Sequence, residues 1–133
     1  MKLKALAATV IAAMIPASAM AHHSFGMFDL QKSVTFVGTV TEYDWENPHT
    51  HIIINVTPGP GVDPSTLGVW DIEGGAVNIM TRFGWNRSVY KVGDKATIVA
   101  HPMKNGSKGA SLFYAEFPDG HKLYNDIPRP GAS

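Results

Sequence analysis

Residues 67–84 read LGVWDIEGGAVNIMTRFG, and the spacing of the apolar side chains changes partway through this stretch. Within the first seven residues, Trp70, Asp71, Ile72 and Glu73 alternate between apolar and polar, which is typical of a half-buried strand because successive side chains point to opposite faces. This alternation predicts a strand over residues 67–73 with Trp70 facing inward. Beyond the two glycines the apolar residues recur every three positions, so we predict a helix over residues 76–83 with Gly84 as its left-handed C-terminal cap.

Four further stretches alternate between apolar and polar residues and are bounded by turn residues. They predict strands at residues 34–45, 49–56, 95–100 and 111–117, followed by a short return strand through Leu123 and Tyr124. Five strands with a helix between the third and the fourth is the order of the OB-fold, a small, partly open Greek-key barrel. We therefore expect an all-β domain with one short helix, an OB-like five-stranded barrel over residues 34–125, and a tail at residues 126–133. Another small β-barrel or a β-sandwich would show a similar order, because order alone does not determine strand pairing.

Residues 1–21 have the three parts of a secretory signal peptide. Two lysines near the start precede a run of apolar and small residues at 5–15, and a proline and a small-residue cleavage zone follow. This zone predicts cleavage after Ala21, or alternatively after Ala19, and a periplasmic or secreted protein. The remaining residues before the domain, 22–33, form an N-terminal arm. The apolar run is about half of the ~20 residues that a membrane-spanning helix needs, so it predicts no transmembrane anchor.

The arm itself carries apolar side chains. Phe25, Met27 and Phe28 lie close together in an otherwise irregular segment. Such a group indicates hydrophobic docking, so we expect the arm to pack against the barrel.

The composition narrows the class of partner and the compartment. Eleven basic and eleven acidic residues balance one another, and the basic residues form no block. Nucleic acids are bound by clustered Lys and Arg, so the charge pattern argues against a nucleic acid partner. About 110 residues can bury a modest core without disulfides, and the sequence has no cysteine. Export without cysteine is more typical of the bacterial periplasm than of small disulfide-rich secreted proteins.

Histidine carries the clearest chemistry in this sequence. Imidazole nitrogen is a ligand for copper, zinc and nickel. The candidate metal ligands are His22, His23, His49, His51 and His101. His49 and His51 are two positions apart on a predicted strand and therefore share a face. The opposite face carries isoleucines and must be the core side, so both histidines are expected to point outward.

Three kinds of metal site are compatible with these residues. Cleavage at the first site leaves His22 as the first residue, and its free amine and ring nitrogen can then bind Cu(II). A second imidazole, from His49, His51 or His101, would complete that site. Cleavage at the other position leaves an amine, two backbone amides and the imidazole of His22, a square-planar nitrogen set that Cu(II) and Ni(II) favour. The third possibility is Zn(II) held by His49, His51 and a carboxylate.

Aromatic and acidic residues offer further candidates. Trp45 is predicted to be exposed, where it could stack against a ligand as aromatic residues do on OB-folds, whereas Trp70 and Trp85 are predicted to be core residues. Asp71 and Glu73 share the outer face of the third strand, and a solvated face is expected there rather than an acid–base pair. The sequence has no nucleophile elbow and no phosphate-binding glycine loop, so no catalytic residue is predicted.

Four motifs together resemble a known family. They are His22-His23-Ser24-Phe25, Trp45-Glu46-Asn47-Pro48-His49, Gly84-Trp85 and Val92-Gly93-Asp94. Over residues 22–125 the chain is similar to the small secreted bacterial proteins grouped as domain of unknown function 6152. That resemblance implies an exported protein of this extent and brings no activity, substrate or cofactor. His22, His23 and His49 match the family's pattern. At the position of His51 an aromatic residue is more typical of the family. At the position of His101 the family's pattern is only weakly defined.

The sequence thus favours an exported binding module that holds a transition metal, with copper preferred over zinc or nickel, through the processed N-terminal histidine and a second histidine. The alternative is a β-barrel of the cell envelope that binds a small ligand, a glycan or a protein without a metal. An oxidative copper enzyme is a third possibility that rests on the ligand types alone. Whether the protein is an enzyme is left open, with a binding role preferred.

Overall fold

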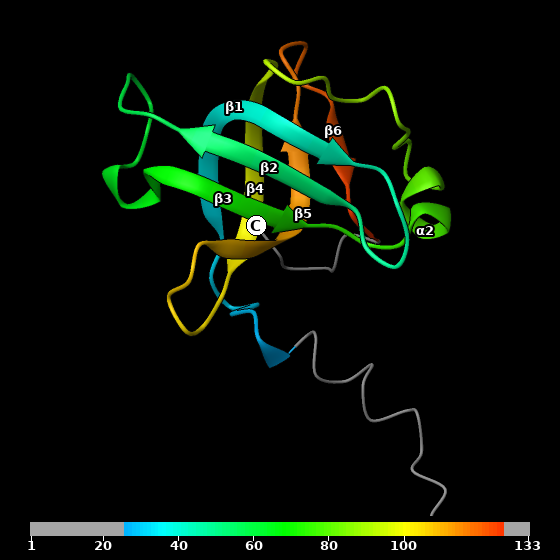
Figure 1. Ribbon diagram of the computed structural model, residues 1–133, viewed down its shortest axis with the longest axis horizontal. Coiled ribbons are helices and arrows are strands. Elements are labelled where there is room, and N and C mark those ends of the chain that lie inside the picture. The colour runs from blue at the N-terminus through cyan, green and yellow to red at the C-terminus, as the bar shows by residue number, and fades with distance from the viewer. Residues whose placement is uncertain (1–25, 127–133) are drawn as a thin grey trace, which may run out of the picture.

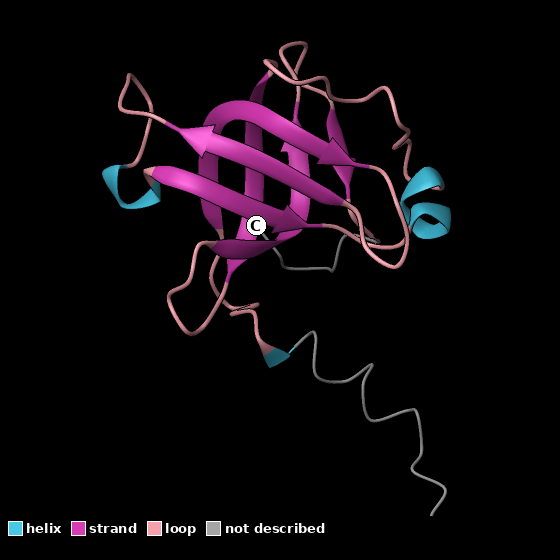
Figure 2. Ribbon diagram, in the orientation of Figure 1, coloured by secondary structure: helices cyan, strands magenta, loops and turns pink. Residues whose placement is uncertain are grey.

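Residues 26–126 are described by the computed structural model, and five of their strands close into a barrel (Figure 1). The strands are β1 (Val34–Asp44), β2 (His51–Val56), β3 (Gly68–Glu73), β4 (Lys95–Pro102), β5 (Gly109–Glu116) and β6 (Lys122–Tyr124). The helix α2 (Val77–Thr81) lies between β3 and β4, and a short 3-10 helix (Pro64–Thr66) precedes β3. Figure 2 shows α2 beside one end of β2 and β3 and the 3-10 helix at their other end.

The barrel closes through one parallel pairing. Along the sheet the order is β3-β2-β1-β4-β5-β6, with antiparallel neighbours throughout. β3 also pairs with β5 in parallel, so that Asp71 lies opposite Gly109 and Glu73 lies opposite Ser111. A five-stranded closed barrel with its helix between the third and fourth strands is the arrangement of the OB-fold. The predicted all-β, OB-like barrel with one short helix is therefore confirmed.

The core lies inside the barrel, where the alternation of the strands places it. Trp70 and Ile72, the inward residues of β3, are both buried, and the ring centroid of Trp70 lies 4.7 Å from that of Phe36. Trp85, which follows α2, is buried as well, and its indole N–H donates a hydrogen bond of 2.8 Å to the carbonyl of Tyr124. The core roles predicted for Trp70 and Trp85 are confirmed.

Trp45 is also a core residue, so the prediction that it is exposed is wrong. It is only 8% exposed, and its ring centroid lies 6.1 Å from that of Tyr43. The reason is a β-bulge in β1 between Val40 and Glu42. An extra residue in a strand moves every later side chain to the opposite face. The even-numbered residues of β1 therefore face inward before the bulge and the odd-numbered ones after it.

β2 begins at His51 rather than at residue 49. The backbone of Thr50 pairs with the glycines that follow β3 instead of continuing the ladder. Its N–H donates to the carbonyl of Gly75 at 3.1 Å, and its carbonyl accepts from the N–H of Gly74 at 2.8 Å. His49 consequently lies beyond the end of β2. The other strand bounds agree with the predicted ones to within two residues.

α2 is shorter than the predicted helix over residues 76–83. The N–H groups of Phe83 and Gly84 donate to carbonyls three positions back, so the chain tightens into a turn after Thr81. Gly84 has a φ of +93° and ends the turn in the left-handed conformation that glycine favours, as predicted. Within residues 26–126, no helix has both the length and the apolar character needed to cross a membrane.

Gly74 makes a close backbone approach that admits no side chain. A Cβ at this position would overlap the hydroxyl of buried Thr50 and lie 2.8 Å from the sulfur of buried Met80. We expect Gly74→Ala to lower the free energy of unfolding by about 2 kcal/mol, because overpacking a filled core forces neighbouring groups to shift. Urea denaturation followed by circular dichroism measures this change.

Gly59→Ala is the matched control, because no heavy atom lies within 4 Å of the added Cβ. It should change the free energy of unfolding by less than about 0.5 kcal/mol. Equal stability of the two variants would contradict the packing described around Gly74.

Candidate metal-binding site

His49 and Glu73 lie within ion-pair distance of each other where β2 begins and β3 ends. Nδ1 of His49 lies 3.1 Å from Oε1 of Glu73 and 3.3 Å from the carbonyl oxygen of Gly74. Both oxygens are acceptors, so the neutral form of the ring carries its proton on Nδ1 and has its lone pair on Nε2. Metal-binding histidines typically have this arrangement, in which a carboxylate or carbonyl orients the ring through its other nitrogen. His49 therefore offers Nε2 as a metal ligand.

A second histidine–carboxylate pair lies beside the first on the outer face of the barrel. Nδ1 of His51 is 2.8 Å from Oδ1 of Asp71. In the strand register His51 lies opposite Glu73, Glu73 opposite Ser111, and Ser111 opposite His101. Opposed residues point to the same face of a sheet, so these four side chains form one row across β2, β3, β5 and β4. The outward orientation predicted for His51 is confirmed.

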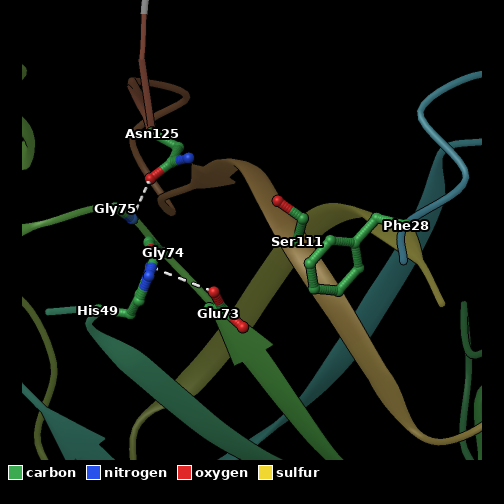
Figure 3. A pocket seen from close by; sticks show the side chains of 7 residues that line it. All are labelled: Phe28, His49, Glu73, Gly74, Gly75, Ser111 and Asn125. Atoms are coloured by element: carbon green, nitrogen blue, oxygen red, sulfur yellow. Dashed lines mark hydrogen bonds and ion pairs between the residues drawn. The ribbon is translucent and has the colours of Figure 1, made fainter. Parts of the chain in front are cut away.

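A cavity of about 50 Å³ adjoins His49 (Figure 3). It is lined by Phe28, His49, Glu73, Gly74, Gly75, Ser111 and Asn125. The side-chain oxygen of Asn125 accepts a hydrogen bond of 2.7 Å from the N–H of Gly75. The amide nitrogen of Asn125 is consequently the donor end, and Figure 3 shows it on the side of the cavity where Ser111 lies.

The N-terminal arm is anchored at this cavity through Phe28. This side chain is only 4% exposed, and its backbone forms an isolated bridge with Met103. The N–H of Lys104 donates to the carbonyl of Met27 at 2.9 Å. The expected docking of the arm on the barrel is confirmed for Phe28, whereas Met27 is 45% exposed.

His101 contacts the arm rather than the cavity. Its Nδ1 lies 2.8 Å from the carbonyl oxygen of Lys32, and its ring stacks on Phe113 with 5.4 Å between centroids. Neighbouring strands are about 4.8 Å apart, so the path along the row from His101 to His51 is roughly 14 Å, which in a closed barrel is an upper limit on their backbone separation. His101 thus holds the arm against β4 and β5.

In the described residues, the predicted ligands His49 and His51 lie in neighbouring positions but do not share a carboxylate. His49 and His51 contact different carboxylates, and residues 26–126 contain no group of three or more histidine or acidic side chains placed to hold a metal ion. The zinc group of His49, His51 and one shared carboxylate is therefore not formed by this part of the chain. His22 and His23 lie outside the described residues, and the predictions for them stay predictions.

Five lining residues of the cavity were not identified as site residues from the sequence: Phe28, Gly74, Gly75, Ser111 and Asn125. Ser111 and Asn125 come from β5 and from the end of β6, and Phe28 comes from the arm. Nothing in their local sequence marks them, because the β3–β5 pairing and the docking of the arm bring them together. Glu73 was predicted to be solvated, and its side chain is 24% exposed beside His49.

Residues 9–112 match a family of unknown function, DUF6152. No curated protein and no solved structure matches the chain. The family match covers well over half of the sequence and includes His22, His23 and His49. The chain therefore belongs to DUF6152, the family that its motifs resemble.

Proposed function

We propose that this protein is an exported, periplasmic or secreted binding module that holds one transition-metal ion, copper by preference, between His22 at the processed N-terminus and His49. One observation carries the proposal: Phe28, only six residues after His22, is anchored in the wall of the cavity that His49 also lines.

The anchored arm limits how far His22 can lie from His49. An extended chain advances at most about 3.5 Å per residue, so His22 starts within roughly 20 Å of Phe28. Removal of a leader after Ala21 would give His22 a free amine beside its imidazole. The N-terminal residue would then supply two nitrogen ligands, and the Nε2 of His49 a third.

The donor set favours copper over the alternatives. Three nitrogen ligands without a thiolate suit Cu(II), which binds such sites more strongly than Zn(II) or Ni(II). Glu73 and the carbonyl of Gly74 hold His49 in the required tautomer before the metal arrives. Residues 26–126 contain no group of three or more histidine or acidic side chains placed to hold a metal ion, so the processed terminus would have to supply the remaining ligands.

The cavity beside His49 is small for an organic ligand, which favours a metal ion as the bound species. Pockets for organic ligands are typically about 300–1,000 Å³, and the cavity beside His49 measures about 50 Å³. The alternative of a glycan-binding barrel loses its main support, because Trp45 is buried in the core. An oxidative copper enzyme would need turnover by the copper-loaded protein as separate support.

The first test concerns the ligands themselves. Protein exported with its own leader, with its N-terminus verified by intact mass, should bind one Cu(II) with nitrogen hyperfine structure in its EPR spectrum. His49→Ala, and separately one extra residue placed before His22, should each weaken copper affinity by about 100-fold or more, since loss of even an orienting partner costs 10–100-fold.

His121→Ala is the matched control for these variants. His121 also pairs with a carboxylate, that of Asp119, but it lies on the hairpin between β5 and β6. Its replacement should leave copper affinity unchanged. Unchanged affinity after the extension before His22 would refute the proposed site, and it would equally refute the site formed by cleavage after Ala19.

A second test concerns Glu73 as the positioning residue of His49. Glu73→Gln removes the charge beside Nδ1 and should weaken copper binding by about tenfold. Asp71→Asn makes the same kind of change beside His51 and should have little effect. Competition titrations against a chelator of known affinity measure both, and a larger loss in Asp71→Asn would assign the metal to His51 instead.

A third test concerns the anchored arm. Phe28→Ala should lower the free energy of unfolding by about 3 kcal/mol, because it empties a buried aromatic site, and should also weaken copper binding by releasing the arm. Met27→Ala, at the exposed neighbouring position, should alter neither property appreciably. Thermal unfolding and copper titration at a temperature where both variants are folded give the comparison. Full copper affinity in folded Phe28→Ala would show that the anchor is not required.

A further inference from the structure

The negative charge of this protein is concentrated in the part of the chain that forms β1, β2 and β3. Residues 33–81, which include all three strands, contain six acidic residues and neither lysine nor arginine. Residues 82–126 contain seven lysines and arginines and four acidic residues. The three strands are neighbours in the sheet and lie side by side (Figure 1), so one side of the barrel is acidic.

The strand register arranges the outward side chains of these strands in two adjoining rows. The rows consist of Glu42, Ile53 and Asp71, and of Asp44, His51 and Glu73. We call these six residues the acidic face. Paired residues point to the same face of a sheet, so four carboxylates surround Ile53. The two rows are about 7 Å apart along the strands, and each row extends about 10 Å across them.

No lysine or arginine neutralises these carboxylates within the described residues. In residues 26–126 every ion pair of a carboxylate is with a histidine. The two carboxylates of β1 are exposed and take part in none of these pairs. Lys95 donates to the hydroxyl of Thr39 at 3.0 Å, and Lys108 donates to the carbonyl of Leu67, both outside the acidic face. Its charge is therefore left for a partner to neutralise.

The acidic face also has an apolar centre. Ile53 is half-buried in the middle of one row, and Val69, its diagonal neighbour on β3, is 56% exposed. Protein interfaces typically combine an apolar centre with a polar rim. Charges at such a rim select a partner of opposite charge and speed its association. The face thus has two features of an interface, and the sign of its charge excludes a nucleic acid.

We propose that the acidic face is a docking surface for a cationic segment of another protein, one that carries lysine or arginine on both sides of an apolar side chain. The apolar side chain packs on Ile53 and Val69, and the cations lie against the carboxylates around them. Carboxylates about 7–10 Å apart require several cations on one chain rather than a single small cation. This proposal does not depend on a metal site, because Glu42 and Asp44 are not among the proposed metal ligands.

A labelled peptide with one leucine between two pairs of arginines is the probe. Its binding to metal-free protein is measured by fluorescence anisotropy. The affinity should fall at least about tenfold between about 20 and 500 mM NaCl, because salt screens exposed charges. Glu42→Gln combined with Asp44→Asn should weaken binding at least about fivefold at low salt. Replacing the leucine of the peptide by serine should weaken it at least about threefold, because the apolar contact is lost.

Glu116→Gln combined with Asp126→Asn is the matched control. Both residues are exposed and lie outside the acidic face, at the end of β5 and after β6, and their replacement removes the same charge. This variant should change the affinity for the peptide less than about twofold. Circular dichroism checks that both double variants are folded.

Three results would overturn the proposal. Equal losses in the two double variants would show that the peptide responds to net charge alone. A serine peptide that binds as tightly as the leucine peptide would show that the apolar centre is not used. Salt-sensitive self-association that Glu42→Gln with Asp44→Asn abolishes, without binding of the peptide, would assign the face to a second copy of the chain. Copper affinity should be the same in this double variant and in wild type, so the proposed metal site is tested separately.

Discussion

The parallel pairing of β3 with β5 is the constraint on which both the barrel and the candidate site depend. It involves only the last three residues of β3, Asp71–Glu73, against Gly109–Ser111, and the N–H of Asp71 also donates to the carbonyl of Lys108 at 3.1 Å. Without this pairing, one edge of β3 and the first residues of β5 would be open, and exposed edges invite association with other chains. The same pairing places Ser111 beside Glu73, and thereby builds one wall of the cavity next to His49.

The rest of the β3 edge is covered by a charged side chain rather than by a strand. Lys108 extends past Gly68, where its ammonium group donates a hydrogen bond to the carbonyl of Leu67 and lies 5.9 Å from the ring centroid of Trp70. A lysine on a strand edge opposes pairing with another chain, because a partner strand would have to bury its charge. The barrel is thus closed by hydrogen bonds at the end of β3 that carries the site and by Lys108 at the other end.

The sequence predicted the element order and most of the core because both follow from local alternation. Trp70 and Ile72 are buried as the parity of their strand predicted, and Trp85 is buried as its position after the helix cap predicted. Trp45 was misplaced because a bulge between Val40 and Glu42 reverses the parity of β1, and no residue in that stretch signals an extra unpaired position. Parity is a strong guide to burial only for strands with an uninterrupted register.

The sequence predicted histidine as the chemically important residue of the candidate site. It did not predict which other residues lie next to that histidine. His49 stood out because imidazole is a common metal ligand. Its partner Glu73 and the lining residues Ser111 and Asn125 belong to segments 24 to 76 positions away, and only strand pairing brings them together. The end of β2 was equally hidden, because the pairing of Thr50 with Gly74 and Gly75 is a tertiary contact. Those hydrogen bonds place His49 beyond the ladder and next to the cavity.

His49 and His51 are chemically identical residues in different surroundings. Each is held through Nδ1 by a carboxylate, so each presents Nε2 in the same tautomer. Only His49 shares a cavity with the anchored arm, and only there can a ligand from the N-terminus be added at little cost in chain ordering, because Phe28 is already fixed. In the proposed site the terminal amine of His22 is a ligand, and in the precursor that nitrogen is an amide. The barrel then offers a preformed half-site from the moment it folds, and removal of the leader supplies the other half. Metal binding of the proposed kind would be tied to export, since a chain that kept its leader would have the histidines but would lack the amine.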